Sequence, residues 1–524
     1  MSTARSSTDP GPATWRAPAT VAGETLRTTG DVGSLFRFRL SGLRGGARRA
    51  APVALGVLVL ITLATAVVPA FGPEYDVSRG DVMIVLPSAY LSVLVISIVS
   101  AATSGGGREL LPREQAVAFP VSPTTDHLGA LLMAPLNIAW LLQCWVVVGA
   151  TSYGIGARPT LVLALLPVFA WLFAATAMAQ LLAWVVEWVR RGPHGALVVR
   201  GAAVLLVTGM AILIATDRLT GLLDDSPTLR VALGVLDGAD GRVGPWLQLM
   251  AGLLVIATLA LVLGGWTAGR VARRPTRDEV RLQSSSRPAR ANPASDLVAL
   301  MRIDRTSIWR SLPIRRGLVV LAFFPGMVAV AGSFRWDTLG IFPGLVASGG
   351  ALLFGVNSWC LDGRGALWRD SLPVSPRLAF GSRVIVLLEV LLAATAVTLV
   401  LASLRAGVPT ASQLVSVLCA ALVVTVQVVA TSLRWSVRRP YAVDLRSSRA
   451  TPAPPLVMVG YSSRLAVTTT LTGLLFNLAS HAPWTWPLMM SVPLLLWSGV
   501  RLLRTARAWG DTGIRSRVIA TVAV

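Results

Sequence analysis

The chain alternates between long apolar stretches and shorter polar segments rich in arginine. Each apolar stretch runs for about 20 residues, the length that a helix needs to cross about 30 Å of hydrocarbon. A first series of predicted membrane spans covers residues 52–71, 82–102, 128–154, 161–189, 196–215 and 246–266, and a second covers 317–332, 339–360, 384–404, 411–433, 464–480 and 484–503. The pattern therefore predicts about twelve transmembrane helices in two sets of six.

Composition leads to the same fold class. Hydrophobic residues make up 54% of the 524 residues and charged residues only 14%, whereas soluble proteins usually carry roughly 25% charged residues. A soluble domain could not bury so much apolar surface. We therefore predict an all-α polytopic membrane protein, multi-pass in a plasma membrane of bacterial type.

The charge of the loops predicts the orientation of the spans. The net charge is +22, and arginine carries all the positive charge because the chain contains no lysine. Arginines follow spans four, six, ten and twelve, while the loops after spans one and five are acidic. Since arginines near helix ends stay in the cytoplasm, both termini are predicted to be cytoplasmic. The lipid bilayer then accounts for the basic charge, and no nucleic-acid partner is predicted.

The two sets of spans have the features of an internal repeat. A basic segment ending in paired arginines precedes each set, "SLFRFRLSGLRGGARRA" and "DLVALMRIDRTSIWRSLPIRRG". Apolar side chains recur in both at helical spacing, which favours a helix lying in the membrane surface over a solvated basic flank; these are Phe36, Leu40 and Leu43 in the first and Leu297, Leu300, Met301 and Ile308 in the second. The predicted organisation is a disordered cytoplasmic tail (1–32), a first six-helix repeat (33–269), a cytoplasmic linker (270–296), a second six-helix repeat (297–505) and a cytoplasmic tail (506–524).

The tetrapeptide Pro-Val-Ser-Pro occurs twice, beginning at Pro120 and at Pro373, each time before a long apolar run on the predicted cytoplasmic side. Proline lacks a backbone N–H and pushes the preceding residue out of helical geometry, so a short upstream helix should end at Phe119 or Leu372. The following Ser-Pro is a helix start, in which serine caps and proline occupies the first turn. Two copies in matching places favour a paired docking element over an ordinary helix start.

This layout resembles the permeases of the ATP-binding-cassette type-2 exporter family, as two six-span units fused in one chain. The resemblance rests on a surface helix before the first span, six spans, and a short helix that ends in a Leu-Pro-Val-Ser-like corner before the third. It implies that segments 105–123 and 363–376 contact separate ATPase subunits, present in two copies, which would bind the ATP. The implied coupling residues are Arg108, Arg113, Glu114, Phe119, Pro120 and Ser122 in the first set and Arg364, Arg369, Asp370, Leu372, Pro373 and Ser375 in the second.

Catalytic motifs do not emerge from the sequence. A phosphate-binding loop needs a lysine, which the chain lacks, and His127, His194 and His481 are scattered without metal-ligand or triad spacing. We therefore predict that the chain is not an enzyme, carries no cofactor of its own and holds no metal. ATP hydrolysis would belong to the partner subunits.

Polar residues within the predicted spans are the candidates for a substrate path. Glu389 is the one carboxylate deep in a span, where a charge is costly and should face a cavity or a partner; the other candidates are Asn137, Gln143 and Asn357. Glu389 could belong to a transport path or a proton-linked site, or it could simply pair with an arginine or another helix.

Three functions are compatible with the sequence. The first is a permease that exports a small hydrophobic or amphipathic compound, such as a drug, an antibiotic or a lipid. The second is an ion-driven transporter with twelve spans, for which intramembrane acids are usual. The third, with less support, is a membrane glycosyltransferase that would use outer-loop acids such as Glu74 and Asp76.

Overall fold

The computed structural model describes most of the chain. The described residues are 30–34, 46–73, 78–103, 122–134, 138–216, 218, 221–222, 225–274, 291, 293, 295–332, 334–353, 355–363, 365–441 and 455–523. Every regular element in these ranges is helical. The disordered tail and linker predicted at 1–32 and 270–296 fall largely outside them, as does the apolar stripe of the first surface helix.

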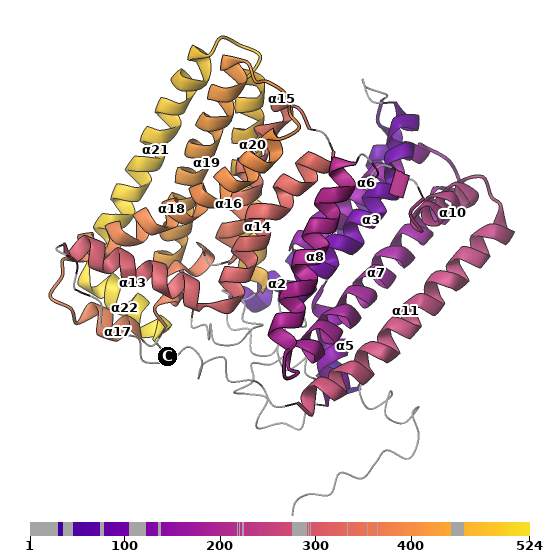
Figure 1. The fold of residues 1–524 in the computed structure, drawn as a ribbon, viewed down its shortest axis with the longest axis horizontal. Helices are drawn as coiled ribbons and strands as arrows, with labels where there is room; N and C mark the ends of the chain where they lie inside the picture. Colours follow the sequence, from indigo (N-terminus) through magenta and orange to yellow (C-terminus); the bar gives the residue numbers. More distant parts are fainter. Residues whose placement is uncertain are drawn as a thin grey trace, which may run out of the picture.

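Two groups of helices lie side by side (Figure 1). The first group contains α2 (Gly46–Val67), η1 (Val68–Phe71), α3 (Arg79–Thr103), α5 (Pro123–Met133), α6 (Ile138–Ile155), α7 (Leu161–Arg190), α8 (Gly195–Ala215), α10 (Leu229–Ala239) and α11 (Val243–Ala272). The second contains α13 (Asp296–Arg310), α14 (Leu312–Ala331), α15 (Trp336–Leu339), α16 (Phe342–Leu353), η3 (Gly355–Leu361), α17 (Gly365–Asp370), α18 (Pro376–Ser403), α19 (Ala411–Arg438), α20 (Pro455–Ala479), α21 (Thr485–Gly510) and α22 (Thr512–Val522).

The prediction of a helical, multi-span membrane protein is confirmed at this level. Six of the described helices are long and apolar enough to cross a membrane, namely α3, α7, α11, α18, α19 and α21. A seventh candidate is the pair formed by α13 and α14, whose axes differ by 84°. The other predicted spans also fall on helices, but these are shorter or less apolar.

Two predicted spans are interrupted. The stretch 128–154 is divided between α5 and α6, and the stretch 339–360 between α16 and η3. In the second case the helix breaks at Asn357, whose φ of −145° and ψ of 63° are not helical. Close packing surrounds this break, because a Cβ on Gly355 would lie 2.6 Å from the Ser432 hydroxyl.

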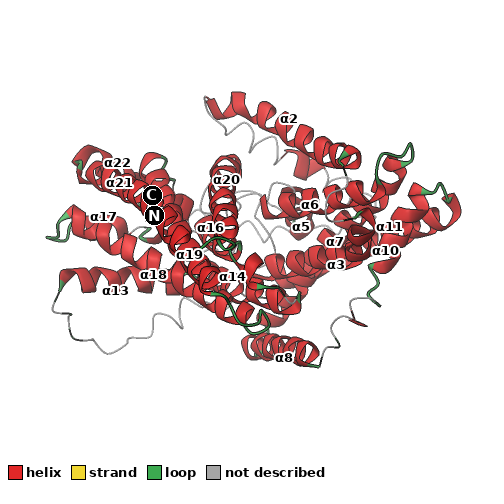
Figure 2. Cartoon of the chain, turned by 90° about the horizontal axis from the view of Figure 1, so that it is seen from above, coloured by secondary structure: helices red, strands yellow, loops and turns green. Residues whose placement is uncertain are grey.

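One helix occupies the centre of each group. Half of the residues in the apolar stretch of α7 and two thirds of those in the apolar stretch of α19 are buried (50% and 67%). Each of these helices is the fourth of its series of predicted spans. α7 packs mainly against α11 and α3, and α19 packs mainly against α21 and against α16 and α20. The fourth and sixth helices of each series therefore pair in the same way. α2 and α8 lie at opposite edges of the molecule (Figure 2).

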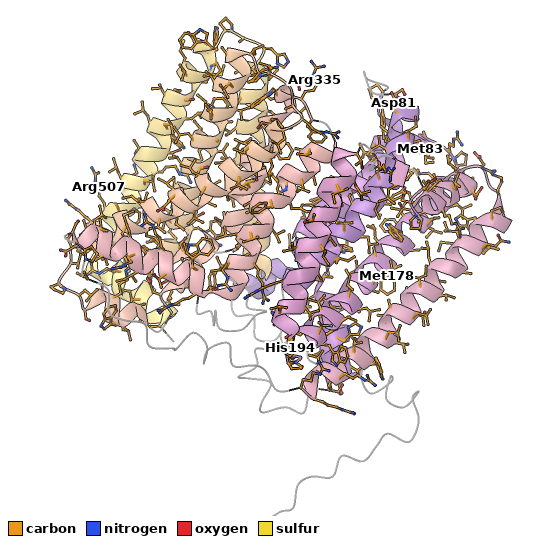
Figure 3. All side chains as sticks on the ribbon, in the orientation of Figure 1. Asp81, Met83, Met178, His194, Arg335 and Arg507 are labelled. Atoms are coloured by element: carbon orange, nitrogen blue, oxygen red, sulfur yellow. The ribbon has the colours of Figure 1, made fainter. Side chains whose placement is uncertain are left out.

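Polar side chains mark the two ends of the helices. Asp81 and Arg335, in segments predicted to lie outside, are at the upper edge of the molecule, whereas His194, predicted to lie inside, is at the lower edge (Figure 3). α5 and α17, which adjoin the two Pro-Val-Ser-Pro sequences, also lie at the lower edge (Figure 1). The order of the helices is thus compatible with the orientation predicted from the arginines.

The long loop of the first repeat, 217–245, folds back onto the helices. Its helix α10 packs on α7, and the Thr228 hydroxyl donates to the Pro87 carbonyl at 2.8 Å. The contact is close at Gly238, where an added Cβ would lie 2.7 Å from the backbone oxygen of Leu163.

We expect Gly238→Ala to lower the thermal stability of the purified protein, because backbone cannot move aside and overpacking costs about 1–3 kcal/mol. Gly252→Ala on α11 is the matched control, since nothing lies within 4 Å of its added Cβ and alanine is the better helix former by about 1 kcal/mol. Thermal unfolding in detergent measures both. Equal melting temperatures for the two variants would contradict the close contact.

Candidate functional site

Both Pro-Val-Ser-Pro sequences start helices in the predicted way. α5 begins at Pro123, and the backbone N–H of Thr125 donates to the Ser122 hydroxyl at 3.0 Å. α18 begins at Pro376, and the N–H of Leu378 donates to the Ser375 hydroxyl at 3.3 Å. Each serine therefore satisfies an N–H that the first turn of the helix leaves free. This part of the prediction is confirmed.

The second copy closes a short helix that projects from the group. α17 ends at Asp370, two residues before the predicted end at Leu372, and Pro373 follows as an exposed residue. We call residues 365–376, which comprise α17 and the segment up to the end of Pro-Val-Ser-Pro, the α17 corner. Its outer face is apolar, since Leu367 and Trp368 are both 60% exposed. Contiguous exposed apolar patches occur at sites where proteins bind partners or the membrane.

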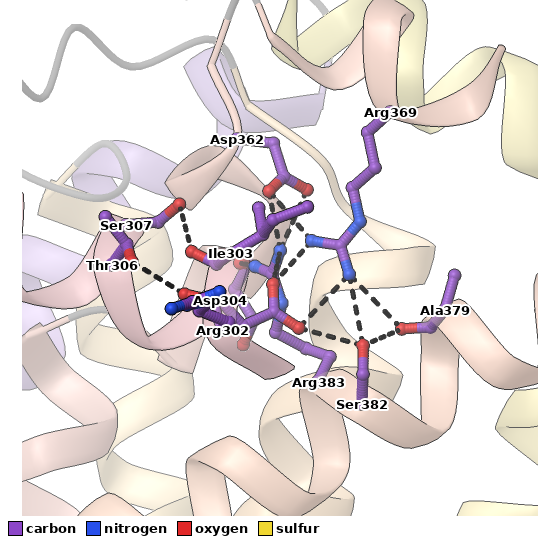
Figure 4. Close-up of polar contacts among 11 residues, drawn as sticks. Arg302, Ile303, Asp304, Thr306, Ser307, Asp362, Arg369, Ala379, Ser382 and Arg383 are labelled. Atoms are coloured by element: carbon purple, nitrogen blue, oxygen red, sulfur yellow. Dashed lines mark hydrogen bonds and ion pairs between the residues drawn. The ribbon is translucent and has the colours of Figure 1, made fainter. Parts of the chain in front are cut away.

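A buried ion-pair network fixes the α17 corner to its neighbours (Figure 4). Arg369 of α17 contacts Asp304 of α13 and Asp362 of the preceding turn, with its Nη2 3.1 Å from Asp304 Oδ2 and its Nη1 2.9 Å from Asp362 Oδ1. Arg383 of α18 contacts the same two carboxylates, at 2.9 Å from Asp304 and 2.7 Å from Asp362. The Ser382 hydroxyl donates to Asp304 at 2.9 Å.

The charges of this network balance. Two guanidinium groups face two carboxylates, and the exposed fraction of each side chain is 7% or less. Burial alone would raise the pKa of Asp304, but the charges of Arg383 and Arg369 and the Ser382 hydroxyl hold that pKa below its usual range. The carboxylate therefore stays ionised. Removing one partner would leave a charge buried without compensation, which costs about 3–5 kcal/mol.

The position of Arg369 changes its expected role. The resemblance to exporter permeases implies that it is a coupling residue that contacts an ATPase. Its side chain is 7% exposed and engaged by two carboxylates, so it cannot present its charge to a partner. Arg369 instead holds the α17 corner in position. Replacing it with an acidic residue would bring a third carboxylate next to the buried Asp304 and Asp362. Leu367 and Trp368 are the side chains that face outward.

The C-terminal helix completes the site. The segment 506–524, predicted as a tail, contains the end of α21 and all of α22, and Val518, Ile519 and Val522 are buried. Arg515 Nε donates to Asp370 at 3.0 Å, and the rings of Trp359 and Trp509 stack with centroids 3.8 Å apart. A cavity of about 130 Å³ opens here, and its lining includes Trp359, Arg369, Pro376, Trp509, Arg515 and Ile519.

The remaining predicted site residues are not gathered in one place. Arg108, Arg113, Glu114, Phe119, Pro120, Asn137 and Arg364 lie outside the described residues. Gln143 is half-buried on α6, and the buried Asn357 donates to the Tyr441 carbonyl at 2.6 Å. Glu389 is paired with Arg305 of α13, whose Nη2 lies 2.8 Å from Oε2, and both side chains are over 40% exposed (43% and 46%). No hydrogen bond joins Gln143, Asn357 and Glu389 to one another in the described part of the chain.

Sequence analysis did not identify Asp304, Asp362 and Arg383. A signal existed for the first of them, because Leu300, Asp304 and Ile308 follow one another at four-residue intervals on α13 and are all buried. An acid in the middle of an apolar stripe predicts a buried basic partner. The sequence does not indicate which arginine that partner is.

Comparison with known proteins adds no assignment. No protein-family model, no curated protein and no solved structure matches the chain. Among the described residues, no three His, Cys, Asp or Glu side chains are grouped to hold a metal ion. The resemblance in layout to type-2 exporter permeases therefore stays a prediction.

We expect Arg383→Met to destabilise the protein by about 3–5 kcal/mol, because it leaves Asp304 and Asp362 short of one counter-charge. Arg377→Met, on an exposed residue of the same helix, should change stability by less than about 0.5 kcal/mol. The free energy of unfolding or the melting temperature in detergent separates the two. If both variants have the melting temperature of the wild type, the network does not stabilise the α17 corner.

Proposed function

We propose that the chain is the membrane permease of an ATP-driven exporter and that separate ATPase subunits act on it through the α17 corner. The observation that carries this proposal is that α17 exposes two large apolar side chains and is held in place by buried ion pairs. Leu367 and Trp368 offer an anchor of the kind that dominates protein interfaces, and the buried network behind them resists local deformation. A push on α17 would therefore reach α13 and α18 together.

The transported compound is proposed to be small and hydrophobic or amphipathic, moving between two repeats of six spans. The similar pairing of the fourth and sixth helices in both series supports the repeat. The placement of Asp81, Arg335 and His194 at opposite ends (Figure 3) supports alternating spans. ATP would bind to the partner subunits, in two copies, and this chain would supply the path.

Ion-driven transport is the alternative. It would depend on Glu389, the acid within a membrane span, but the ion pair with Arg305 gives this carboxylate a structural partner. In that alternative, Glu389→Gln should abolish transport, and dissipating the proton gradient should stop it in the absence of any ATPase. Under the proposal, transport in vesicles requires the ATPase and ATP.

Twelve alternating spans predict which residues an impermeant thiol reagent can reach. Arg335→Cys should react from outside intact cells, and Arg507→Cys only after permeabilisation, because the two residues follow spans seven and twelve. The native cysteines Cys144, Cys360 and Cys419 are buried, so the unmodified chain is the control. Labelling of both variants from the same side would rule out this arrangement.

Docking at the α17 corner predicts that Trp368→Ala weakens binding of the ATPase subunit by about 30-fold, the effect of losing an interface anchor worth about 2 kcal/mol. Trp484→Ala is the matched control, since Trp484 is 53% exposed but precedes α21 at the opposite end. Co-purification and stimulation of ATP hydrolysis report the difference. A partner that binds both variants equally well would show that docking lies elsewhere.

A further inference from the structure

Five arginines on three neighbouring helices gather beyond the ion-pair network. Arg434 and Arg438 are on α19, Arg464 is on α20, and Arg501 and Arg504 are on α21. α19 packs against both other helices. All five lie near the predicted cytoplasmic ends of these helices, since spans ten and twelve end at 433 and 503 and span eleven begins at 464. They are close enough for the charges of Arg434 and Arg501 to interact with those of the others, and we call them the arginine cluster.

The cluster differs from the network around Arg369 in having no acidic partner among the described residues. Within the described residues, none of the five arginines forms an ion pair, and the Nε of Arg501 is buried without a hydrogen-bond partner.. Like charges that lie near one another repel. An orientation signal does not need such crowding, because arginines spread over the loops serve it equally well. A bound anion would remove the cost.

The place of the cluster along the helices suggests where the anion comes from. The five residues lie beside the ends of predicted spans ten, eleven and twelve, at 433, 464 and 503, which is the depth of lipid head groups. From Arg464 into the membrane, Val467, Leu471 and Leu474 follow on the same face of α20 and are exposed. Trp497 and Val500 are exposed on α21 next to Arg501. Basic groups above an apolar face fit an amphiphile with an anionic head.

We propose that Arg434, Arg438, Arg464, Arg501 and Arg504 form a binding site for the phosphate group of an anionic phospholipid. The guanidinium groups would bind the phosphate oxygens, and the acyl chains would lie along the exposed faces of α20 and α21. A free phosphate shares the head-group chemistry but makes no use of these apolar faces. This site is independent of the ATPase and would exist whatever compound the protein transports.

The test uses the full chain in nanodiscs of phosphatidylcholine with or without about 20% phosphatidylglycerol. Native mass spectrometry of the released protein measures how strongly phosphatidylglycerol is retained relative to phosphatidylcholine. One basic residue near an anionic membrane surface is worth about a fivefold change in binding, so R464Q/R501Q should reduce this preference roughly 30-fold. The control R200Q/R377Q removes two exposed arginines outside the cluster and should reduce the preference clearly less than R464Q/R501Q does, because neither arginine would contact the bound phosphate. R434Q/R504Q replaces the first variant if that one does not fold.

Three outcomes would overturn the proposal. The wild type could retain both lipids equally, or the cluster and control variants could lose the preference to the same degree, which would indicate a general surface charge. Alternatively, inorganic phosphate or pyrophosphate added to phosphatidylcholine nanodiscs could raise the melting temperature of the wild type but not that of R464Q/R501Q. Phosphatidylglycerol would in that case leave the melting temperature of the wild type unchanged. That result would assign the cluster to a soluble phosphate. If the wild type binds no ATPase subunit but keeps its preference for phosphatidylglycerol, only the proposed function is contradicted.

Discussion

The ion-pair network of Asp304, Asp362, Arg369 and Arg383 is the interaction on which the second group of helices depends at its lower end. Buried charges are tolerated only when they are paired and hydrogen-bonded, so the four side chains fix one another. They also come from α13, α17, α18 and the turn after η3, which are separate elements. A short surface helix that would otherwise be marginal thereby acquires a defined position and an outward-facing apolar side.

Arginine has two different roles in this protein, and the nearest acids decide between them. Arg369 and Arg383 are buried because two aspartates neutralise them, and the result is rigid internal structure. Arg434 and Arg501 have no such neighbours among the described residues, and they lie near the ends of predicted spans ten and twelve. Under the inference above, their charge binds a lipid phosphate. The same net positive composition thus supplies both an internal brace and a surface for anions.

The sequence predicted the helical fold class and the local helix starts, because both follow from short-range physics. Apolar length sets the spans, and Ser122 and Ser375 cap their helices through N–H groups three residues away. The sequence did not predict that Arg369 is buried, because its partner Asp304 is 65 residues away in the chain and is brought to it only by tertiary packing. The break at Asn357 was missed for a similar reason, because average hydropathy is insensitive to backbone geometry.

The two series of helices also differ in ways that bear on how the halves could work. The third span of the first series is divided into α5 and α6, whereas its counterpart α18 is one helix of 28 residues. The ion pair of Glu389 and Arg305 has no equivalent among the described residues of the first series. When two repeats are separate copies of one chain, a change in one is a change in both. A single chain that carries both can stabilise one half by ion pairs that the other half does not need. Under the proposed function, ATPase subunits acting on the two halves would then move them unequally.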